Sequence, residues 1–245
     1  MPSIDYEDIG FDIRADLKAA HARTWARIAA PGTWFDSATR LAIAAESRNA
    51  DACDLCARRR DALSPYTIDG VHDSIGDLPE AVVEVIHRVV TDPGRLTQAW
   101  YQSCLDAGLT EEEFVETVGV TCSAIAIDSF AYAAGIPLRS LPDPAAGEPA
   151  RIRPAEASQS GAWVPWIAPE DARGDDIGNF GPGCSNIQRA LSLVPAEAHG
   201  YLDLDVVQYL KPEEMRDIGR ECRAISRAQI ELIAGRVSYL SQCAY

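Results

Sequence analysis

Apolar residues recur every three or four positions along most of this chain, a spacing that places them on one face of an α-helix. No segment shows a convincing alternation of apolar and polar residues, which would indicate a half-buried strand. We therefore expect an all-α fold, a helical bundle. The predicted helices cover residues 11–29, 37–49, 53–62, 78–91, 95–107, 110–134, 187–193, 196–209 and 213–240.

The helix over residues 110–134 has the clearest ends. Thr110 followed by three glutamates forms a capping-box pattern, which is typical of a helix start. Gly135 and Pro137 follow the last apolar position and indicate its end. Because its apolar residues cover a broad face, we expect this helix to lie at the centre of the core.

Proline and glycine interrupt the helical pattern for about forty residues after this helix. Such a stretch is either a linker or a long excursion from the domain. Trp163 and Trp166 favour contact of part of it with a domain surface, since large aromatic side chains are costly to leave in water. We predict a helical domain over 1–142, a Pro/Gly-rich linker over 143–185 and a partial second helical domain over 186–245.

Composition narrows the possible partners and the compartment. The chain has 245 residues, of which 47% are hydrophobic, enough to bury a core. The net charge of −15 repels phosphate backbones, so we expect no nucleic-acid partner. The start is acidic and does not resemble a signal peptide, and no apolar run approaches the roughly 18 residues of a membrane span. Seven cysteines, an odd and scattered set, favour a reducing cytoplasm over a secreted disulfide framework.

Cys53 and Cys56 form a C-x-x-C pair, the strongest candidate for chemistry. This spacing at a helix start puts both sulfurs on one face, close enough to form a disulfide. Asp51 is an N-cap type of residue, so we expect Cys53 in the first turn of a new helix. The positive end of the helix lowers a thiol pKa there, and the thiolate can attack a peroxide oxygen. The neighbouring thiol then resolves the sulfenic acid.

Two structural alternatives stand beside the redox reading. The pair could be half of a zinc site, but zinc requires four ligands. The other internal cysteines form no second close pair, and Cys104 and Cys122 fit small buried hydrophobes. The pair could also be two core cysteines on an apolar helix face. The sequence thus predicts neither a metal site nor a cofactor.

Several further residues have competing interpretations. Glu231 lies twelve residues before Cys243, and a carboxylate folded back over a thiol can relay protons, although a solvated glutamate is the simpler alternative. The same choice applies to Glu46, seven residues before Cys53. His87 stands among apolar residues, which is typical of a core histidine.

The arginines 58–60 fit a solvated helix face, although a guanidinium near Cys56 would help to hold a thiolate. Ser241 precedes Cys243 as Asp51 precedes Cys53, a weak internal repeat that predicts a second helix start.

These residues resemble the alkylhydroperoxidase D and carboxymuconolactone decarboxylase superfamily, whose signature is Glu, eleven residues, then C-x-x-C-x-x-x-H. Glu231 and Cys243 match its beginning, and the stretch 226–234 is similar to the helix that precedes the family's motif. The resemblance covers most of 33–140 and about 186–245. It is greatest to two-unit alkylhydroperoxidase-related proteins, some of which contain selenocysteine.

In those proteins the second motif reads Cys-x-Tyr followed by cysteine or selenocysteine, and Cys243-Ala244-Tyr245 matches it up to the last residue given. Our expectation is that the next codon is UGA and that a resolving residue, the motif histidine and final helices follow. The first motif departs from the family, because Arg60 stands where its histidine would be and Leu41 where its glutamate would be.

The resemblance implies a homo-oligomeric, alkylhydroperoxidase- or peroxiredoxin-like oxidoreductase with antioxidant activity. Its catalytic residues would be Cys53, Cys56, Glu231 and Cys243, its substrate a small hydroperoxide, and its reductant a thioredoxin-like protein or small thiol. Two alternatives remain open: a non-redox decarboxylase-like enzyme that acts on a small acid, and a helical scaffold that has lost catalysis.

Overall fold

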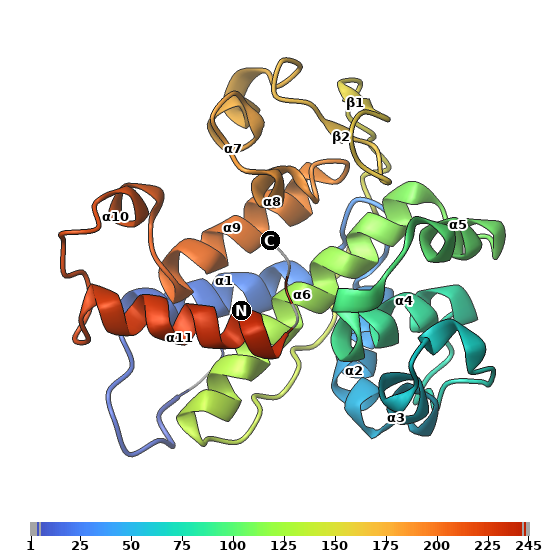
Figure 1. Ribbon diagram of the computed structural model, residues 1–245, viewed down its shortest axis with the longest axis horizontal. Helices are drawn as coiled ribbons and strands as arrows, with labels where there is room; N and C mark the ends of the chain where they lie inside the picture. Colours follow the sequence, from blue (N-terminus) through green and yellow to red (C-terminus); the bar gives the residue numbers. More distant parts are fainter. Residues whose placement is uncertain (1–3, 5, 242, 244–245) are drawn as a thin grey trace.

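The computed structural model describes residues 4, 6–241 and 243, and confirms the mostly helical fold (Figure 1). Four short 3-10 helices occur within it: η1 (Ala50–Ala52), η2 (Pro65–Thr67), η3 (Pro93–Arg95) and η4 (Gly174–Asp176). The only strands among the described residues are β1 (Ala157–Ser158) and β2 (Trp166–Ile167), which pair antiparallel with Ala157 opposite Ile167. The α-helices are α1 (Ala15–Ala29), α2 (Ser37–Asn49), α3 (Asp54–Asp61), α4 (Glu80–Thr91), α5 (Gln98–Asp106), α6 (Glu111–Ala134), α7 (Ile177–Phe180), α8 (Asn186–Arg189), α9 (Pro195–Gln208), α10 (Pro212–Arg216) and α11 (Arg227–Leu240).

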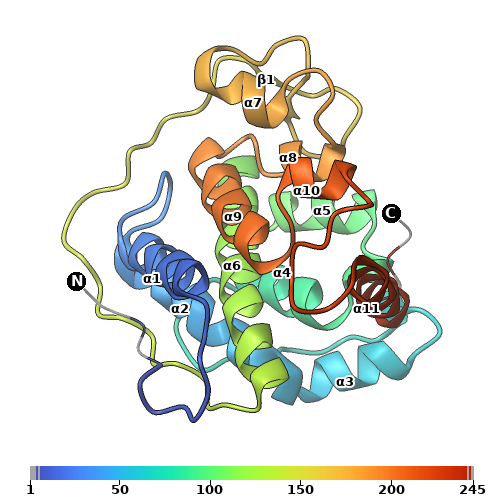
Figure 2. The ribbon, with the colours of Figure 1, turned by 90° about the vertical axis from the view of Figure 1, so that its left-hand side faces the viewer.

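Helix α6 runs through the middle of the bundle, as its apolar pattern predicts (Figure 2). It packs against α2, α4 and α9. Thr110 and Glu113 form the expected capping box, and Gly135 ends the helix in the left-handed conformation that favours glycine. Among the described residues, α6 alone is long and apolar enough to cross a membrane, but 67% of its most apolar window is buried against other helices, as in the core helix of a globular protein.

Helix α9 belongs to the same core, although it lies in the predicted second domain. It packs against α1 and α6, and it contributes Leu204 to the main hydrophobic cluster, which also contains Trp25 and Ile127. The predicted boundary at residue 186 therefore does not coincide with a break in the hydrophobic core.

The segment after α6 is a long excursion over the surface of the bundle (Figure 2). Its backbone is attached to α1 and the loop that follows: the Ala145 amide donates to the Ala29 carbonyl at 2.8 Å, and the Arg151 amide donates to Thr33 at 2.7 Å. The guanidinium carbon of Arg189 lies over the ring of Trp166 in β2, 5.2 Å from the ring centre. This contact agrees with the expectation that an aromatic side chain of the excursion is held against a surface.

The prediction of one helix over 213–240 is wrong. The chain forms α10 and α11 with an irregular stretch between them. Ser226 starts the second helix, because its side chain accepts from the Gln229 amide and Gln229 reciprocates in a capping box. Ile230 is the only buried residue of α11, so most of its apolar residues face solvent.

An ion cluster inside the bundle joins four helices. Arg40 of α2 is fully buried and pairs with Glu116 of α6 and with Glu197 of α9, the latter at 2.7 Å. Arg27 of α1 pairs with the same Glu197. The close approach of α6 and α9 requires Gly119, since a Cβ there would lie 2.7 Å from the Cβ of Glu197. Buried charges are tolerated only when paired, so this cluster fixes how the helices pack.

We predict that Arg40→Met destabilises the fold by about 3–5 kcal/mol, because two buried carboxylates lose their shared cation. Arg23→Met is the matched control, because it breaks an exposed pair with Asp203 and should change the free energy of unfolding by less than about 1 kcal/mol. Denaturant titration measures both changes. Equal effects in the two variants would contradict a structural role for the buried cluster.

His21 of α1 ties the N-terminal segment and α9 to the core. Its Nδ1 lies 2.5 Å from the Tyr6 hydroxyl, and its Nε2 lies 3.0 Å from the side-chain nitrogen of Gln208. Because an amide nitrogen can only donate, Nε2 accepts and the ring is neutral, with its proton on Nδ1. Burial lowers the pKa of His21 from 6.5 to about 4.

Acid should therefore destabilise the protein through His21. Between about pH 6.5 and pH 4 the unfolded chain binds a proton at this residue and the folded chain does not, so stability is complete above that window and falls as pH falls through it. The loss should reach about 3 kcal/mol at most. His21→Gln should flatten this part of the stability profile in denaturant titrations from pH 7.5 to 4; a profile as steep as that of the native chain would exclude His21 as the cause.

Candidate functional site

Cys53 and Cys56 lie at the junction of η1 and α3, and both are almost completely buried. Cys53 is itself the N-cap residue of α3. The expected cap, Asp51, lies in η1 instead. A carboxylate from a later loop takes over that function: Oδ2 of Asp73 accepts from the Asp54 amide at 2.8 Å.

Two histidines approach the thiols. Nδ1 of His72, from the loop between η2 and α4, lies 3.5 Å from both the Cys53 and the Cys56 sulfur. Nδ1 of His87, from α4, lies 3.2 Å from the Cys56 sulfur. The two rings are neighbours, with centres 4.3 Å apart. The dithiol therefore belongs to a four-residue cluster of Cys53, Cys56, His72 and His87, which we call the Cys2His2 cluster.

Each histidine contacts a carboxylate through its other ring nitrogen, Nε2. Nε2 of His87 lies 2.8 Å from Oε1 of Glu46, at the C-terminal part of α2. Nε2 of His72 lies 2.7 Å from Oε2 of Glu84, on α4. Both rings thus point Nδ1 at the sulfurs and Nε2 at a carboxylate, which fixes their orientation.

The two carboxylates are themselves held in place. Glu46 accepts from the Ile75 amide at 3.1 Å and from the Asn49 side chain at 3.1 Å. Glu84 accepts from Arg59 at 2.8 Å and from the Trp100 indole at 2.9 Å. Arg59 is thus largely buried in the site rather than on a solvated face.

The surroundings shift the pKa values of the cluster in opposite directions. Burial opposes ionisation of Cys53, but hydrogen bonding to the Asp73 and Cys56 amides and to His72 outweighs it and lowers the pKa of this thiol. Burial also disfavours charge on His72, but the thiols and Glu84 raise its pKa to about 10. For His87, burial prevails over Glu46 and lowers the pKa, so this ring is neutral near pH 7.

A pocket of about 550 Å³ opens on one side of the cluster. His72 and Glu84 line it, together with Arg59 and Trp100. A small molecule in this pocket would meet the imidazole of His72 before it reached a sulfur. Cys104 also lines the pocket but is buried, which raises the pKa of its thiol to about 12. Cys104 therefore fits the expected buried hydrophobe.

The ligand atoms of the Cys2His2 cluster all lie within 4.8 Å of one another, so these four side chains could hold a metal ion. The cluster therefore permits two kinds of chemistry. It can run thiol redox chemistry with histidine proton carriers, or it can coordinate a metal through two sulfurs and two nitrogens.

The other predicted catalytic residues lie on α11 and beyond it. Glu231 pairs with Arg227 at 2.8 Å and accepts from the Tyr209 hydroxyl at 3.3 Å; its side chain is half exposed. Cys243 is exposed and lines an apolar pocket with Ile230. Neither residue belongs to the Cys2His2 cluster. Residues 244 and 245, on which the second motif depends, lie outside the described part of the chain.

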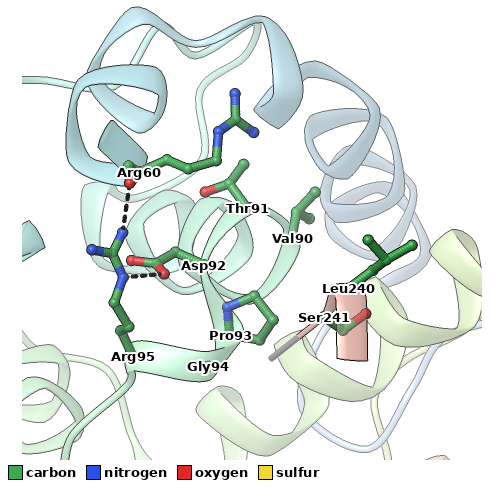
Figure 3. A pocket seen from close by; sticks show the side chains of 9 residues that line it. All are labelled: Arg60, Val90, Thr91, Asp92, Pro93, Gly94, Arg95, Leu240 and Ser241. Atoms are coloured by element: carbon green, nitrogen blue, oxygen red, sulfur yellow. Dashed lines mark hydrogen bonds and ion pairs between the residues drawn. The ribbon is translucent and has the colours of Figure 1, made fainter. Parts of the chain in front are cut away.

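Arg60, at the position of the family's histidine, faces a different pocket, between η3 and the end of α11 (Figure 3). Its carbonyl accepts from Arg95 at 3.2 Å, and Arg95 also pairs with Asp92 at 2.7 Å. Leu240 and Ser241 line the opposite side of this pocket. The imidazoles near the thiols therefore come from other parts of the chain.

Sequence reasoning missed the site role of both histidines. His87 was expected to be a core histidine; it is indeed fully buried, but its polar atoms face a thiol and a carboxylate. His72 lies in a loop without periodic pattern. The available signal was the C-x2-C-x15-H-x14-H spacing, which places four possible metal ligands within 35 residues.

Comparisons with known proteins do not identify the chain: no family model matches it, and neither curated proteins nor solved structures show a significant similarity to it.

Proposed function

We propose that this protein is a thiol-dependent oxidoreductase that reduces small hydroperoxides at Cys53 and Cys56, as its resemblance to alkylhydroperoxidases suggests. The observation that carries the proposal is the aligned arrangement of a thiol, an imidazole and a carboxylate: Cys56 sulfur, His87 and Glu46. Such an arrangement lets a neutral imidazole accept a thiol proton while the carboxylate stabilises the imidazolium.

Cys53 is the nucleophile in this proposal, because its pKa is lowered and it occupies the N-cap position at the start of α3. Its thiolate attacks the terminal oxygen of the hydroperoxide, so that an S–O bond forms and the O–O bond breaks. The departing alkoxide takes a proton from the imidazolium of His72, which lines the pocket. The products are an alcohol and the sulfenic acid of Cys53.

Cys56 resolves the sulfenic acid. It gives its proton to His87, attacks the Cys53 sulfur and forms the disulfide, and the released hydroxide takes the proton from His87 to become water. An external reductant, either one thioredoxin-like dithiol or two molecules of a small thiol, then reduces the disulfide and is itself oxidised to a disulfide, and the regenerated Cys53 thiol gives its proton back to His72. In sum, two thiols and one hydroperoxide give a disulfide, an alcohol and water.

Reduced protein should consume hydroperoxide in the presence of excess dithiol, and Cys53→Ser should lower the rate at least a hundredfold because the nucleophile is lost. Cys184→Ser, at a half-buried cysteine outside the cluster, is the matched control and should leave the rate unchanged. The rate is measured as hydroperoxide remaining over time. Equal turnover by Cys53→Ser and the native chain would overturn the proposal and favour a non-redox enzyme.

His87→Gln should separate the two steps, since it removes the base for Cys56 and leaves Cys53 untouched. We expect the sulfenic acid to accumulate, and disulfide formation to slow by about 10²–10⁴-fold. Trapping with a dimedone-type reagent and mass spectrometry measures the intermediate. His199→Gln, at a histidine paired with Asp176 elsewhere, is the control. Disulfide formation at the native rate in His87→Gln would show that this histidine is not the base.

A further inference from the structure

The Cys2His2 cluster has the donor set, the spacing and the outer support of a zinc site. Two thiol sulfurs and two imidazole nitrogens converge from the junction of η1 and α3, from α3, from the loop before α4 and from α4 itself. Mixed sulfur and nitrogen ligands in a tetrahedron select zinc among the common divalent cations, whereas magnesium and calcium prefer oxygen.

Three sulfur–nitrogen distances agree with a tetrahedron around one ion. Zinc–sulfur bonds of about 2.3 Å and zinc–nitrogen bonds of about 2.0–2.1 Å imply sulfur–nitrogen edges of about 3.5 Å. The three such edges measured here are 3.5 Å (Cys53–His72), 3.5 Å (Cys56–His72) and 3.2 Å (Cys56–His87). All remaining pairs of ligand atoms lie within 4.8 Å.

The carboxylates that contact the two histidines provide an independent argument for a metal site. Histidines that bind a metal almost always donate their other ring N–H to a carboxylate or carbonyl. His87 and His72 both do so, to Glu46 at 2.8 Å and Glu84 at 2.7 Å. Once Nδ1 of His72 has lost its proton, as metal binding requires, the Nδ1 lone pair of each ring is directed at the centre of the cluster. Two thiolates would neutralise the charge of one Zn²⁺, so the ion would bring no net charge into this buried position.

We propose that Cys53, Cys56, His72 and His87 bind one Zn²⁺ ion, held in tetrahedral geometry and closed to solvent. The protein supplies all four ligands, so the ion is of the structural kind, and it joins the loop of His72 to α3 and α4. The proposal does not depend on the peroxidase activity. The two do compete for the same sulfurs, because a thiolate bound to zinc is less available for attack on a hydroperoxide.

Zinc titration of the whole reduced chain tests the site, with a chromophoric chelator as competitor after metal removal. We expect one Zn²⁺ per chain, and at least tenfold weaker binding in Cys53→Ser and His72→Ala. Glu84→Gln keeps all four ligands and should weaken binding about 10–100-fold through the outer support alone. Cys184→Ser and His199→Gln are matched controls and should bind as the native chain does.

Co²⁺ provides a readout that does not depend on affinity. In the native chain it should give the visible bands of a tetrahedral site and a near-ultraviolet thiolate band. The thiolate band should be clearly weaker in Cys53→Ser that circular dichroism shows to be folded, because one of the two sulfur ligands is lost. A reduced, folded native chain that binds no zinc, or a Cys53→Ser variant that binds it as tightly, would overturn the proposal. Hydroperoxide consumption without zinc binding refutes only the metal site, and zinc binding without hydroperoxide consumption refutes only the proposed activity.

Discussion

Every buried charge in this protein needs a partner that offsets its loss of water. This requirement determines which side chains lie together in the core and in the candidate site. In the core, Arg40 lies between Glu116 and Glu197 and thereby fixes α2, α6 and α9 relative to one another. In the site, the equally buried carboxylate of Glu46 accepts hydrogen bonds from the His87 ring, the Ile75 amide and the Asn49 side chain. A charge without such a partner would require several kcal/mol, comparable with the whole stability of a domain.

Helix α2 connects these two regions, because it carries both Arg40 and Glu46. Any movement of α2 against α6 would shift Glu46, and with it the ring that faces Cys56. The helix packing of the core therefore also positions Glu46, the carboxylate that contacts the ring next to Cys56. The position of His72, in contrast, is set by a loop without helix or strand and by the hydrogen bond of its ring to Glu84.

The sequence predicted the helices well where local signals were strong. The helix over 37–49 agrees at both ends, and α6 begins and ends at its predicted caps. It predicted poorly where tertiary contacts decide. Nothing local indicates that the Asp54 amide is capped by Asp73, nineteen residues away, or that Glu46 faces His87 across 41 residues. The C-x-x-C pair could be found because its two members are neighbours on the chain. The histidines come from a loop and from an apolar helix, where hydrophobic periodicity carries no information on side-chain partners.

The thiols also have a role in packing that bears on how this region behaves as a folding unit. Cys53, Leu55 and Cys56 are the buried members of a small hydrophobic cluster separate from the main core, with Ile68 packed against it. Two of these three buried side chains are thus thiols, which can be oxidised to a disulfide or bind a metal ion. Local unfolding is set by the few contacts that hold a region together. The segment from η1 to the start of α4 is therefore a unit whose hydrogen-exchange protection reports the state of its sulfurs, while the main core stays protected throughout.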